Sequence, residues 1–317
     1  MISPGTCRNA GIAWLTVVAL LAAPTGASRL PLPPDTPALL EQIYSFDLDG
    51  AVEAAQRMEA ARPDHPLGYL LEGEALWWRI WCESAEFKYG MTDARRRPKL
   101  DADQRYLQLA AKVSSLAEAQ IKQHDAAEMQ FYAGMADAAA ARFYALRGEN
   151  RNAARAGVRG REHLLHSKSL DPDLADADLG LGLYNYYVDT LSAMARIFRF
   201  FMGIPGGSKQ DGIRLLEHDI ADGDLTSSLA RFYLALNLHR YDLQYEKALA
   251  LIGPLTEKYP TNPLFQLARG DLFAKLGRKE QALACYRAAT GLTIPDAECH
   301  KRVQDLALKS MAALGVR

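Results

Sequence analysis

The sequence of 317 residues lacks the short motifs that usually carry catalysis. It has no Gly-x-Ser-x-Gly, no His-Glu-x-x-His and no Cys-x-x-Cys, so no motif places a nucleophile or a zinc ligand set. The stretch 203–209 reads GIPGGSK, in which Ser208 precedes Lys209, whereas a phosphate loop needs the lysine first and a strand before it. We therefore expect that the protein is not an enzyme and binds no cofactor.

Two groups of potential metal ligands are incomplete. His163 and His166 lie three residues apart with Glu162 nearby, but the sequence places no third ligand. An acidic cluster follows and lacks the turn glycine and the later glutamate of a calcium loop. We interpret these acids as favourable partners for the positive end of the helix that they precede, and we expect no metal. The cluster comprises Asp171, Asp173, Asp176 and Asp178.

The sequence also lacks a strong charge of either sign, because its formal net charge is -1. Nucleic-acid binding needs a basic stripe, and the candidate, Arg95 to Arg97 with Lys99, is interpreted as a solvated loop. Sustained alternation of apolar and polar residues is missing, whereas alanine and other helix-favouring residues run throughout. These patterns predict an all-α fold and argue against nucleic acid as a partner.

The N-terminus carries an apolar run. Arg8 precedes residues 10–23, which are apolar but too short to span a bilayer comfortably, and small residues precede Ser28. We predict a signal peptide over residues 1–27 and export to the periplasm or cell envelope, with an uncleaved anchor as the alternative. Residues 28–37 contain four prolines and are predicted to form an extended spacer.

Cysteine is scarce, with four residues in the chain. Cys82, Cys285 and Cys299 would remain after cleavage before Ser28, and this odd number leaves at least one unpaired. Cys285 and Cys299 fall on neighbouring predicted helices and could form a bridge. Cys82 beside Trp81 is more simply a small buried hydrophobic residue, and we favour three buried thiols.

A repeat is present near the C-terminus. Residues 245–250 (YEKALA) return 34 residues later as 279–284 (KEQALA), and this period is typical of helical repeats. Within residues 263–295, Gly270 allows close helix approach and Gly277 ends the first helix. The stretch resembles a tetratricopeptide repeat (TPR), which implies a superhelix of stacked antiparallel helix pairs. Its small, aromatic and small positions are Ala282, Tyr286 and Ala289.

The resemblance extends more weakly along the chain. The spacing from Ala248 to Pro260, typical of the second helix of a repeat, recurs from Ala51 to Pro63. We therefore predict divergent repeats over residues 38–178, and two repeats with a capping helix over residues 227–317. Gln266 and Arg269 depart from the family, which has tryptophan and leucine at these positions.

The central segment, residues 179–226, is predicted to contain an inserted apolar helix, Leu191 to Met202, and a glycine-rich loop. With Gly182, Gly206-Gly207 and Asp211 it resembles the inclusion-body clearance proteins and the tetratricopeptide repeat protein 39 family. The match departs at Ile204 and Lys209 and supports the architecture alone. The apolar helix is expected to plug the superhelix, with a membrane surface or a partner as alternatives.

The predicted function is a protein-interaction scaffold that binds a peptide or partner protein in the concave groove of the superhelix. The alternatives are a ligand- or partner-binding component of a solute transport system, and a hydrolase whose groups converge in three dimensions. Trp78 lies in an aromatic cluster that fills either the core or the groove. The candidate partner-binding residues are Arg231, Asn237, Gln266, Arg269, Asp271, Trp78 and Tyr187.

Overall fold

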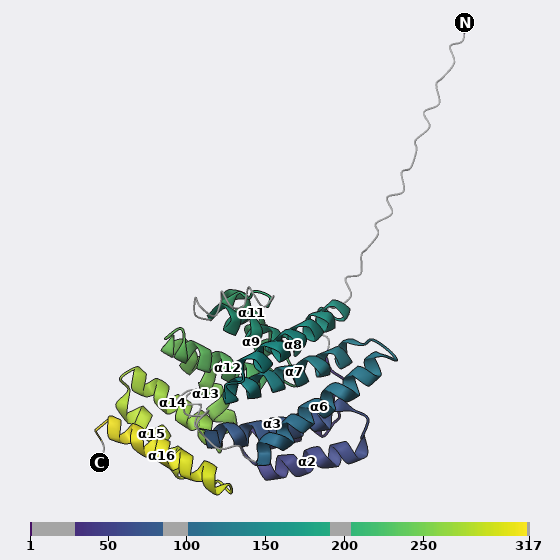
Figure 1. Ribbon diagram of the computed structural model, residues 1–317. Coiled ribbons are helices and arrows are strands. Elements are labelled where there is room, and N and C mark those ends of the chain that lie inside the picture. Colours follow the sequence, from purple (N-terminus) through teal and green to yellow (C-terminus); the bar gives the residue numbers. More distant parts are fainter. Residues whose placement is uncertain (2–28, 85–100, 191–203, 316–317) are drawn as a thin grey trace.

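The computed structural model describes the chain apart from residues 2–28, 85–100, 191–203 and 316–317. All regular elements in the described ranges are α-helices, and consecutive helices pack side by side in antiparallel pairs (Figure 1). The all-α class and the stacking of helix pairs are thereby confirmed. The helices are α1 (Thr36–Tyr44), α2 (Leu48–Ala61), α3 (Pro66–Ser84), α6 (Asp101–Ile121), α7 (Ala127–Arg147), α8 (Asn150–Leu170), α9 (Ala177–Thr190), α11 (Lys209–Asp222), α12 (Ser227–Arg240), α13 (Tyr245–Lys258), α14 (Pro263–Lys275), α15 (Lys279–Thr290) and α16 (Ala297–Ala313).

Several sequence predictions fall outside these ranges. They are the signal peptide, the basic cluster at Arg95 to Arg97 and the apolar helix from Leu191 to Met202. Within the described part of the chain, no helix has both the length and the apolar character needed to cross a bilayer.

The C-terminal helix pairs pack closely because small residues face large ones. A Cβ atom added at Gly270 in α14 would lie 2.6 Å from Cε1 of Tyr286 in α15, so glycine is needed at this crossing. The Tyr286 hydroxyl then donates a 2.6 Å hydrogen bond to Asp271. Gly277 has a φ of 72°, the left-handed conformation expected after α14. The predicted roles of these glycines are confirmed.

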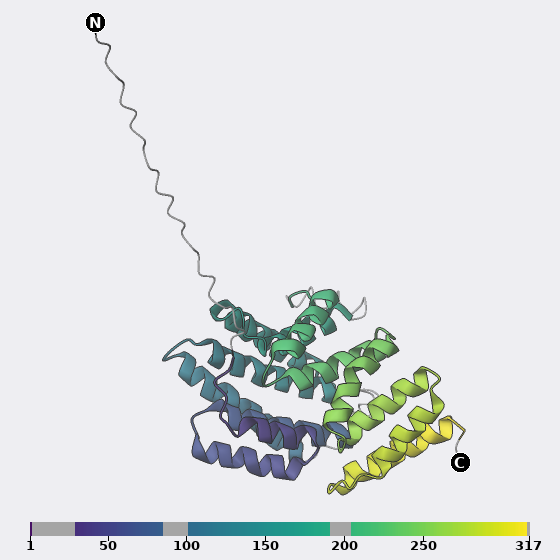
Figure 2. The same cartoon turned by 180° about the vertical axis from the view of Figure 1, so that it is seen from behind.

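The array curves until its last helices meet its first. Helix α16 contacts α3, which comes from the first part of the chain, and Figures 1 and 2 show the yellow C-terminal helices close to α3. A disulfide joins Cys82 at the end of α3 to Cys299 in α16, with 5.3 Å between the Cα atoms. Cys285 is a buried free thiol, so the expectation of three thiols was wrong, as was the suggested Cys285–Cys299 bridge. The sequence suggested Cys285 with Cys299 because these residues lie on neighbouring helices. Closure of the array instead brings Cys82 next to Cys299.

Helix α3 lies inside this closed array and is buried around most of its circumference. The ring centroids of Trp77 and Tyr106 in α6 are 5.6 Å apart, on the side of the first helices. On the other side, Trp78 lies 5.1 Å from Phe232 in α12 and 5.5 Å from Phe265 in α14. The tryptophans point to different sides of α3, as their spacing requires, and both sides are covered. Consequently α3 occupies the inner face of the C-terminal helix pairs.

Candidate functional site

A pocket of about 420 Å³ lies at the junction of the first and last helix pairs, and we call it the junction pocket. Residues 29–34, which belong to no helix, form one wall, and the start of α1 forms the next. The start of α12 and the end of α13 complete it. The lining residues are Arg29, Leu30, Leu32, Pro33, Pro34, Thr36, Pro37, Leu40, Glu41, Tyr44, Asp224, Leu225, Ser227, Ser228, Lys258 and Tyr259.

The wall formed by residues 29–35 has no helix, in agreement with its prolines, which lock φ and remove backbone donors. It is nevertheless packed against the body of the protein, because Leu30 is 5% exposed and Arg29 lies 3.4 Å from the carboxylate of Asp224. Helix α1 begins at Thr36, inside the spacer expected for residues 28–37. The described part of the spacer therefore forms a wall of the pocket.

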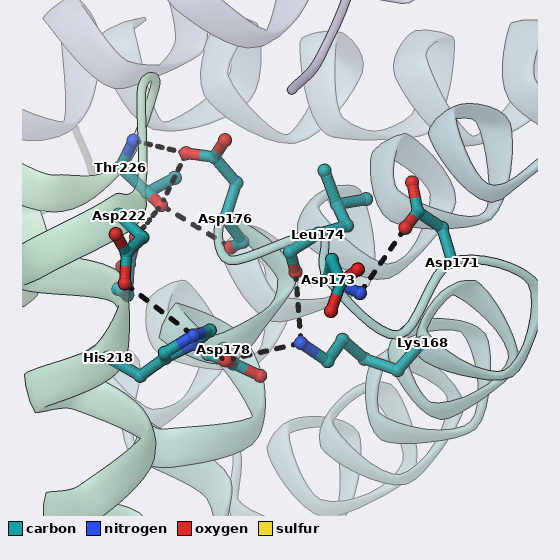
Figure 3. Close-up of polar contacts among 10 residues, drawn as sticks. Lys168, Asp171, Asp173, Leu174, Asp176, Asp178, His218, Asp222 and Thr226 are labelled. Atoms are coloured by element: carbon teal, nitrogen blue, oxygen red, sulfur yellow. Dashed lines mark hydrogen bonds and ion pairs between the residues drawn. The ribbon is translucent and has the colours of Figure 1, made fainter. Parts of the chain in front are cut away.

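The start of α12 is fixed by a buried aspartate that precedes α9 (Figure 3). Oδ1 of Asp176 accepts hydrogen bonds from the backbone N–H groups of Leu225 and Thr226, at 2.7 and 2.9 Å. Asp176 is 2% exposed, so this contact is shielded from water. A carboxylate at this position satisfies donors that a helix start leaves free and complements its dipole. Asp176 thus caps α12, a helix 50 residues further along the chain.

A second carboxyl group, that of Asp219, approaches the same cap. The hydroxyl of Thr226 lies 3.0 Å from Asp176 Oδ1 and 2.8 Å from Asp219 Oδ1, yet it has one proton to donate. Burial raises the pKa of Asp219 well above its usual value, and the nearby Asp176 adds to this. A protonated Asp219 donating to Thr226, which in turn donates to Asp176, satisfies both contacts.

The other acids of the predicted cluster have separate partners (Figure 3). Asp178 accepts hydrogen bonds from His218 at 2.6 Å and from Lys168 at 3.3 Å, while Asp171 accepts one from the backbone N–H of Asp173. Asp176 directly precedes α9 and Asp178 lies in its first turn, as the sequence indicated, but the Asp176 carboxylate also accepts hydrogen bonds from the start of α12, which the sequence did not predict. In the described residues, no three or more His, Cys, Asp or Glu side chains are grouped so that they could hold a metal ion.

The polar groups of the junction pocket come from two helix starts. Thr36 is fully buried at the start of α1, and its Oγ1 has no hydrogen-bond partner among the described residues. Ser227 and Ser228 form the first turn of α12, and the Ser228 hydroxyl lies 3.4 Å from that of Tyr259. Lys258 is exposed at the end of α13. Its Nζ lies 5.0 Å from the centroid of the Tyr259 ring. The groups that a ligand can reach are therefore the first turn of α12 and the Ser228 hydroxyl, which can donate hydrogen bonds to an acceptor.

A pair of carboxyl groups between α2 and α3 has unequal proton affinities. Burial raises the pKa of Glu59 to about 8, and the adjacent Glu72 adds to this increase. Glu72 is held by Arg105 through two hydrogen bonds of 2.9 and 2.6 Å, and it is 2% exposed. Pairs with separated pKa values occur in hydrolases, but neither Glu59 nor Glu72 lines the junction pocket. The sequence offered no motif for this pair, which arises from the packing of α2, α3 and α6.

The candidate partner-binding residues do not gather at the junction pocket. Trp78 and Asn237 are 0% and 1% exposed, so they belong to the core and not to an open groove. Arg231 is half-buried, and Tyr187 is 36% exposed on α9. The other three make contacts within the C-terminal helix pairs. Gln266 donates to the Pro260 carbonyl, Arg269 lies 4.0 Å from Glu257, and Asp271 accepts from Tyr286.

Sequence reasoning therefore missed the junction residues, chiefly Thr36, Ser228 and Lys258. Thr36 and Ser228 stand at helix starts, a signal that predicts a cap but not a pocket. Their proximity depends on closure of the array, for which the sequence has no local pattern. The expectation of an open groove along α12 and α14 is corrected because α3 covers this face.

Comparisons with known proteins give limited information. No protein-family model matches the sequence, and no curated protein is significantly similar to it. Among solved structures, the crystal structure of yeast Tom70 matches over 87% of this chain and 88% of that chain, with 9% sequence identity and a TM-score of 0.30. The description of the fold therefore depends on the helices of this chain itself.

Proposed function

We propose that the protein is a non-catalytic binding scaffold of the periplasm or cell envelope, and that it holds a peptide or partner protein at the junction pocket. The observation that carries the proposal is the pocket itself, which combines apolar and hydrogen-bonding groups from opposite ends of the chain. Recessed sites of this composition are typical of ligand binding. Residues 29–34, which belong to no helix, already lie against the pocket, so a non-helical segment of chain fits this surface.

The proposal moves the binding site away from the inner face of α12 and α14. Phe232 and Phe265, which belong to these two helices, pack on Trp78 from the chain's own α3. A partner peptide on that face would have to displace a helix that the Cys82–Cys299 disulfide holds in place. The junction pocket can be reached without such a rearrangement.

Export is supported by two features of different kinds. The N-terminal sequence has the order of a signal peptide, and the Cys82–Cys299 disulfide fits an oxidising compartment. Cell fractionation followed by N-terminal sequencing of the mature chain tests this part. We expect the chain in the periplasmic or envelope fraction, beginning at Ser28. Recovery of the full-length chain from the cytosol with reduced cysteines would contradict it.

The binding proposal is tested by site-specific cross-linking in the cell. A photo-reactive residue at Leu40, which lines the junction pocket, should trap a discrete partner. The same residue at Leu308, which is 56% exposed on α16 and outside the pocket, is the matched control. Ser228→Trp should abolish trapping at Leu40 by filling the pocket, while the circular dichroism spectrum stays helical. Equal trapping at both positions, or trapping that Ser228→Trp leaves intact, argues against the junction pocket.

A second candidate function is a ligand-binding component of a solute transport system. The observation that favours it is the size of the junction pocket, about 420 Å³, which is in the range that holds small molecules. Stabilisation by a small molecule distinguishes this candidate, because a ligand that binds only the folded state raises the melting temperature. A scaffold for proteins alone would show no such stabilisation.

A further inference from the structure

We propose that the chain is a substrate of a thiol–disulfide isomerase, which converts an early Cys285–Cys299 bridge into the Cys82–Cys299 disulfide of the closed array. Three observations lead to this proposal: which cysteines are paired, how deeply they are buried, and how far apart they lie along the chain. The partner is an enzyme with a reactive dithiol, and its action is independent of the junction pocket.

Burial of the native pair means that oxidation precedes closure of the array. Cys82 is 2% exposed at the end of α3, and Cys299 is 0% exposed in α16. A disulfide forms when a thiolate attacks another sulfur, so the thiols must be accessible to an oxidant. In the closed array an oxidant cannot reach either sulfur, because the residues that carry them are almost fully buried. Oxidation therefore takes place while α3 and α16 are still apart.

In the open chain, Cys299 meets Cys285 far more often than it meets Cys82. Cys285 and Cys299 are 14 residues apart, whereas Cys82 and Cys299 have a separation of 217 residues. The probability of closing a flexible loop falls with about the 3/2 power of its length, so the short loop closes about 60 times more often. A small disulfide such as glutathione disulfide takes the two electrons and leaves as two thiols. The first bridge is therefore Cys285–Cys299.

This early bridge is incompatible with the closed array. In the closed array Cys285 faces α14, because a Cβ atom added at Gly270 would lie 3.2 Å from the Cys285 Cβ atom. Cys299 faces α3 instead, with 5.3 Å between its Cα atom and that of Cys82. The two side chains point toward different helices, and a Cys299 sulfur that is bonded to Cys285 cannot pair with Cys82. The array closes in its native form only after this bridge has been exchanged.

Thiol–disulfide exchange makes the conversion without net oxidation. The isomerase thiolate attacks the Cys299 sulfur and forms a mixed disulfide, and Cys285 leaves as a thiolate that takes up a proton from water. Cys82, after losing its proton to water, attacks the Cys299 sulfur and releases the isomerase thiolate. One disulfide is broken and one is formed, so the isomerase is unchanged at the end.

Closure then prevents the reverse exchange. Cys285 is 8% exposed in the closed array, and burial raises the pKa of its thiol above the usual value. The thiolate is the attacking species, so a buried thiol that stays protonated does not attack the finished disulfide. The free thiol of Cys285 is therefore compatible with a lasting Cys82–Cys299 pair.

Refolding of the reduced protein tests the order of the two bridges. The purified exported chain is reduced in denaturant, diluted into a glutathione redox buffer and alkylated at intervals. Trypsin cleaves at Arg287, between Cys285 and Cys299, so mass spectrometry distinguishes the two bridges. We expect the Cys285–Cys299 bridge first, in about tenfold excess or more over the native pair. Its conversion should be slower than its formation. Formation of Cys82–Cys299 without this precursor would overturn the proposal.

A purified protein disulfide isomerase, added to the same refolding mixture, tests the partner. It should accelerate the conversion severalfold in the wild type. Cys285→Ala removes the competing thiol, so the native disulfide should form without delay and the isomerase should not change its rate. Thr290→Ala, in the same helix α15, keeps the cysteines and should retain both the delay and the acceleration. No acceleration of the wild type, or equal acceleration of Cys285→Ala, would reject the isomerase.

An experiment in the cell needs no refolding from denaturant. In a host that lacks its envelope disulfide isomerase, the wild type should accumulate with the Cys285–Cys299 bridge and Cys285→Ala with the native disulfide. Native pairing of the wild type in that host would contradict the need for an isomerase. These measurements follow cysteine pairs, whereas cross-linking at Leu40 follows a partner in the junction pocket, so either proposal can fail alone.

Discussion

The two regular helix pairs, α12–α13 and α14–α15, are stabilised differently from α3. In the pairs, neighbours in sequence meet, as Asp271 and Tyr286 do across 15 residues. In α3, the contacts come from both ends of the chain, from Tyr44 near the start to Phe265 and Cys299 near the end. Packing of the pairs is therefore a local property, whereas packing of α3 exists only when the array is closed.

This difference changes how the protein is expected to unfold. In an open helical array each repeat contacts only its neighbours, and stability is nearly a sum of neighbouring terms. Here α1 contacts α14 through the Asn262 side chain, and α3 contacts α16 through the disulfide. We infer that the first and last helix pairs unfold together.

The largest effect is expected on removal of the disulfide. Cys82→Ser with Cys299→Ser opens a loop with a sequence separation of 217 residues. In the chain-entropy account, a crosslink of this length contributes about 5 kcal/mol to the free energy of unfolding. Urea denaturation without reductant should show this loss. Cys285→Ser, which removes a free thiol, is the control. An equal loss of unfolding free energy in this control would mean that the disulfide between α3 and α16 does not itself stabilise the protein.

The next effect is expected from Trp78→Ala. Removing a fully buried tryptophan should cost about 3–5 kcal/mol, because a cavity remains between α3, α12 and α14. Amide hydrogen exchange should then rise in α1 and α14 as well as in α3. Phe273→Ala, at a buried position within the C-terminal pair, should raise exchange mainly in α14 and α15. A change confined to α3 in the Trp78 variant would show that the ends are not coupled.

The same contrast explains what the sequence could predict. The roles of Gly270 and Gly277 are evident from spacing alone, because each acts on a helix next to it in the chain. The site of Trp78, the Cys82–Cys299 pairing and the junction pocket depend on contacts between distant residues, such as Thr36 and Ser228. Periodicity carries no information about how far a stack of pairs curves, and curvature decides whether its ends meet.

A smaller effect is expected from Asn262→Ala, which affects both kinds of contact. Asn262 Oδ1 accepts from the N–H groups of Leu264 and Phe265 and caps α14, while its Nδ2 donates to the Tyr44 carbonyl at 2.9 Å. Loss of the cap should cost about 1 kcal/mol, and the unpaired buried carbonyl about 1–2 kcal/mol more. Ser208→Ala, which removes the side-chain cap of α11, is the control. If the Asn262 variant and the control variant lose the same free energy of unfolding, the hydrogen bond from Asn262 to the Tyr44 carbonyl does not contribute to stability.

The smallest effect per pH unit is expected at the start of the C-terminal pairs, where Asp219 of α11 meets the cap of α12. Because the pKa of Asp219 is raised in the folded state, its contribution to stability is complete below the unfolded value near 4 and decreases as pH rises toward the folded value. The decrease is about 1.4 kcal/mol per pH unit at most. Asp219→Asn keeps a donor for Thr226 and removes this titration, so its stability relative to the wild type should increase between pH 5 and pH 8.

Asp222→Asn, in the same helix and with a half-exposed side chain, is the matched control for the pH experiment. Its unfolding free energy should follow the wild-type pH profile. If the Asp219 variant also follows that profile, Asp219 is not protonated in the folded protein, and the chain of hydrogen bonds from Asp219 through Thr226 to Asp176 is wrong. Parallel loss of stability at every pH would instead assign Asp219 a packing role, since a steric defect does not titrate.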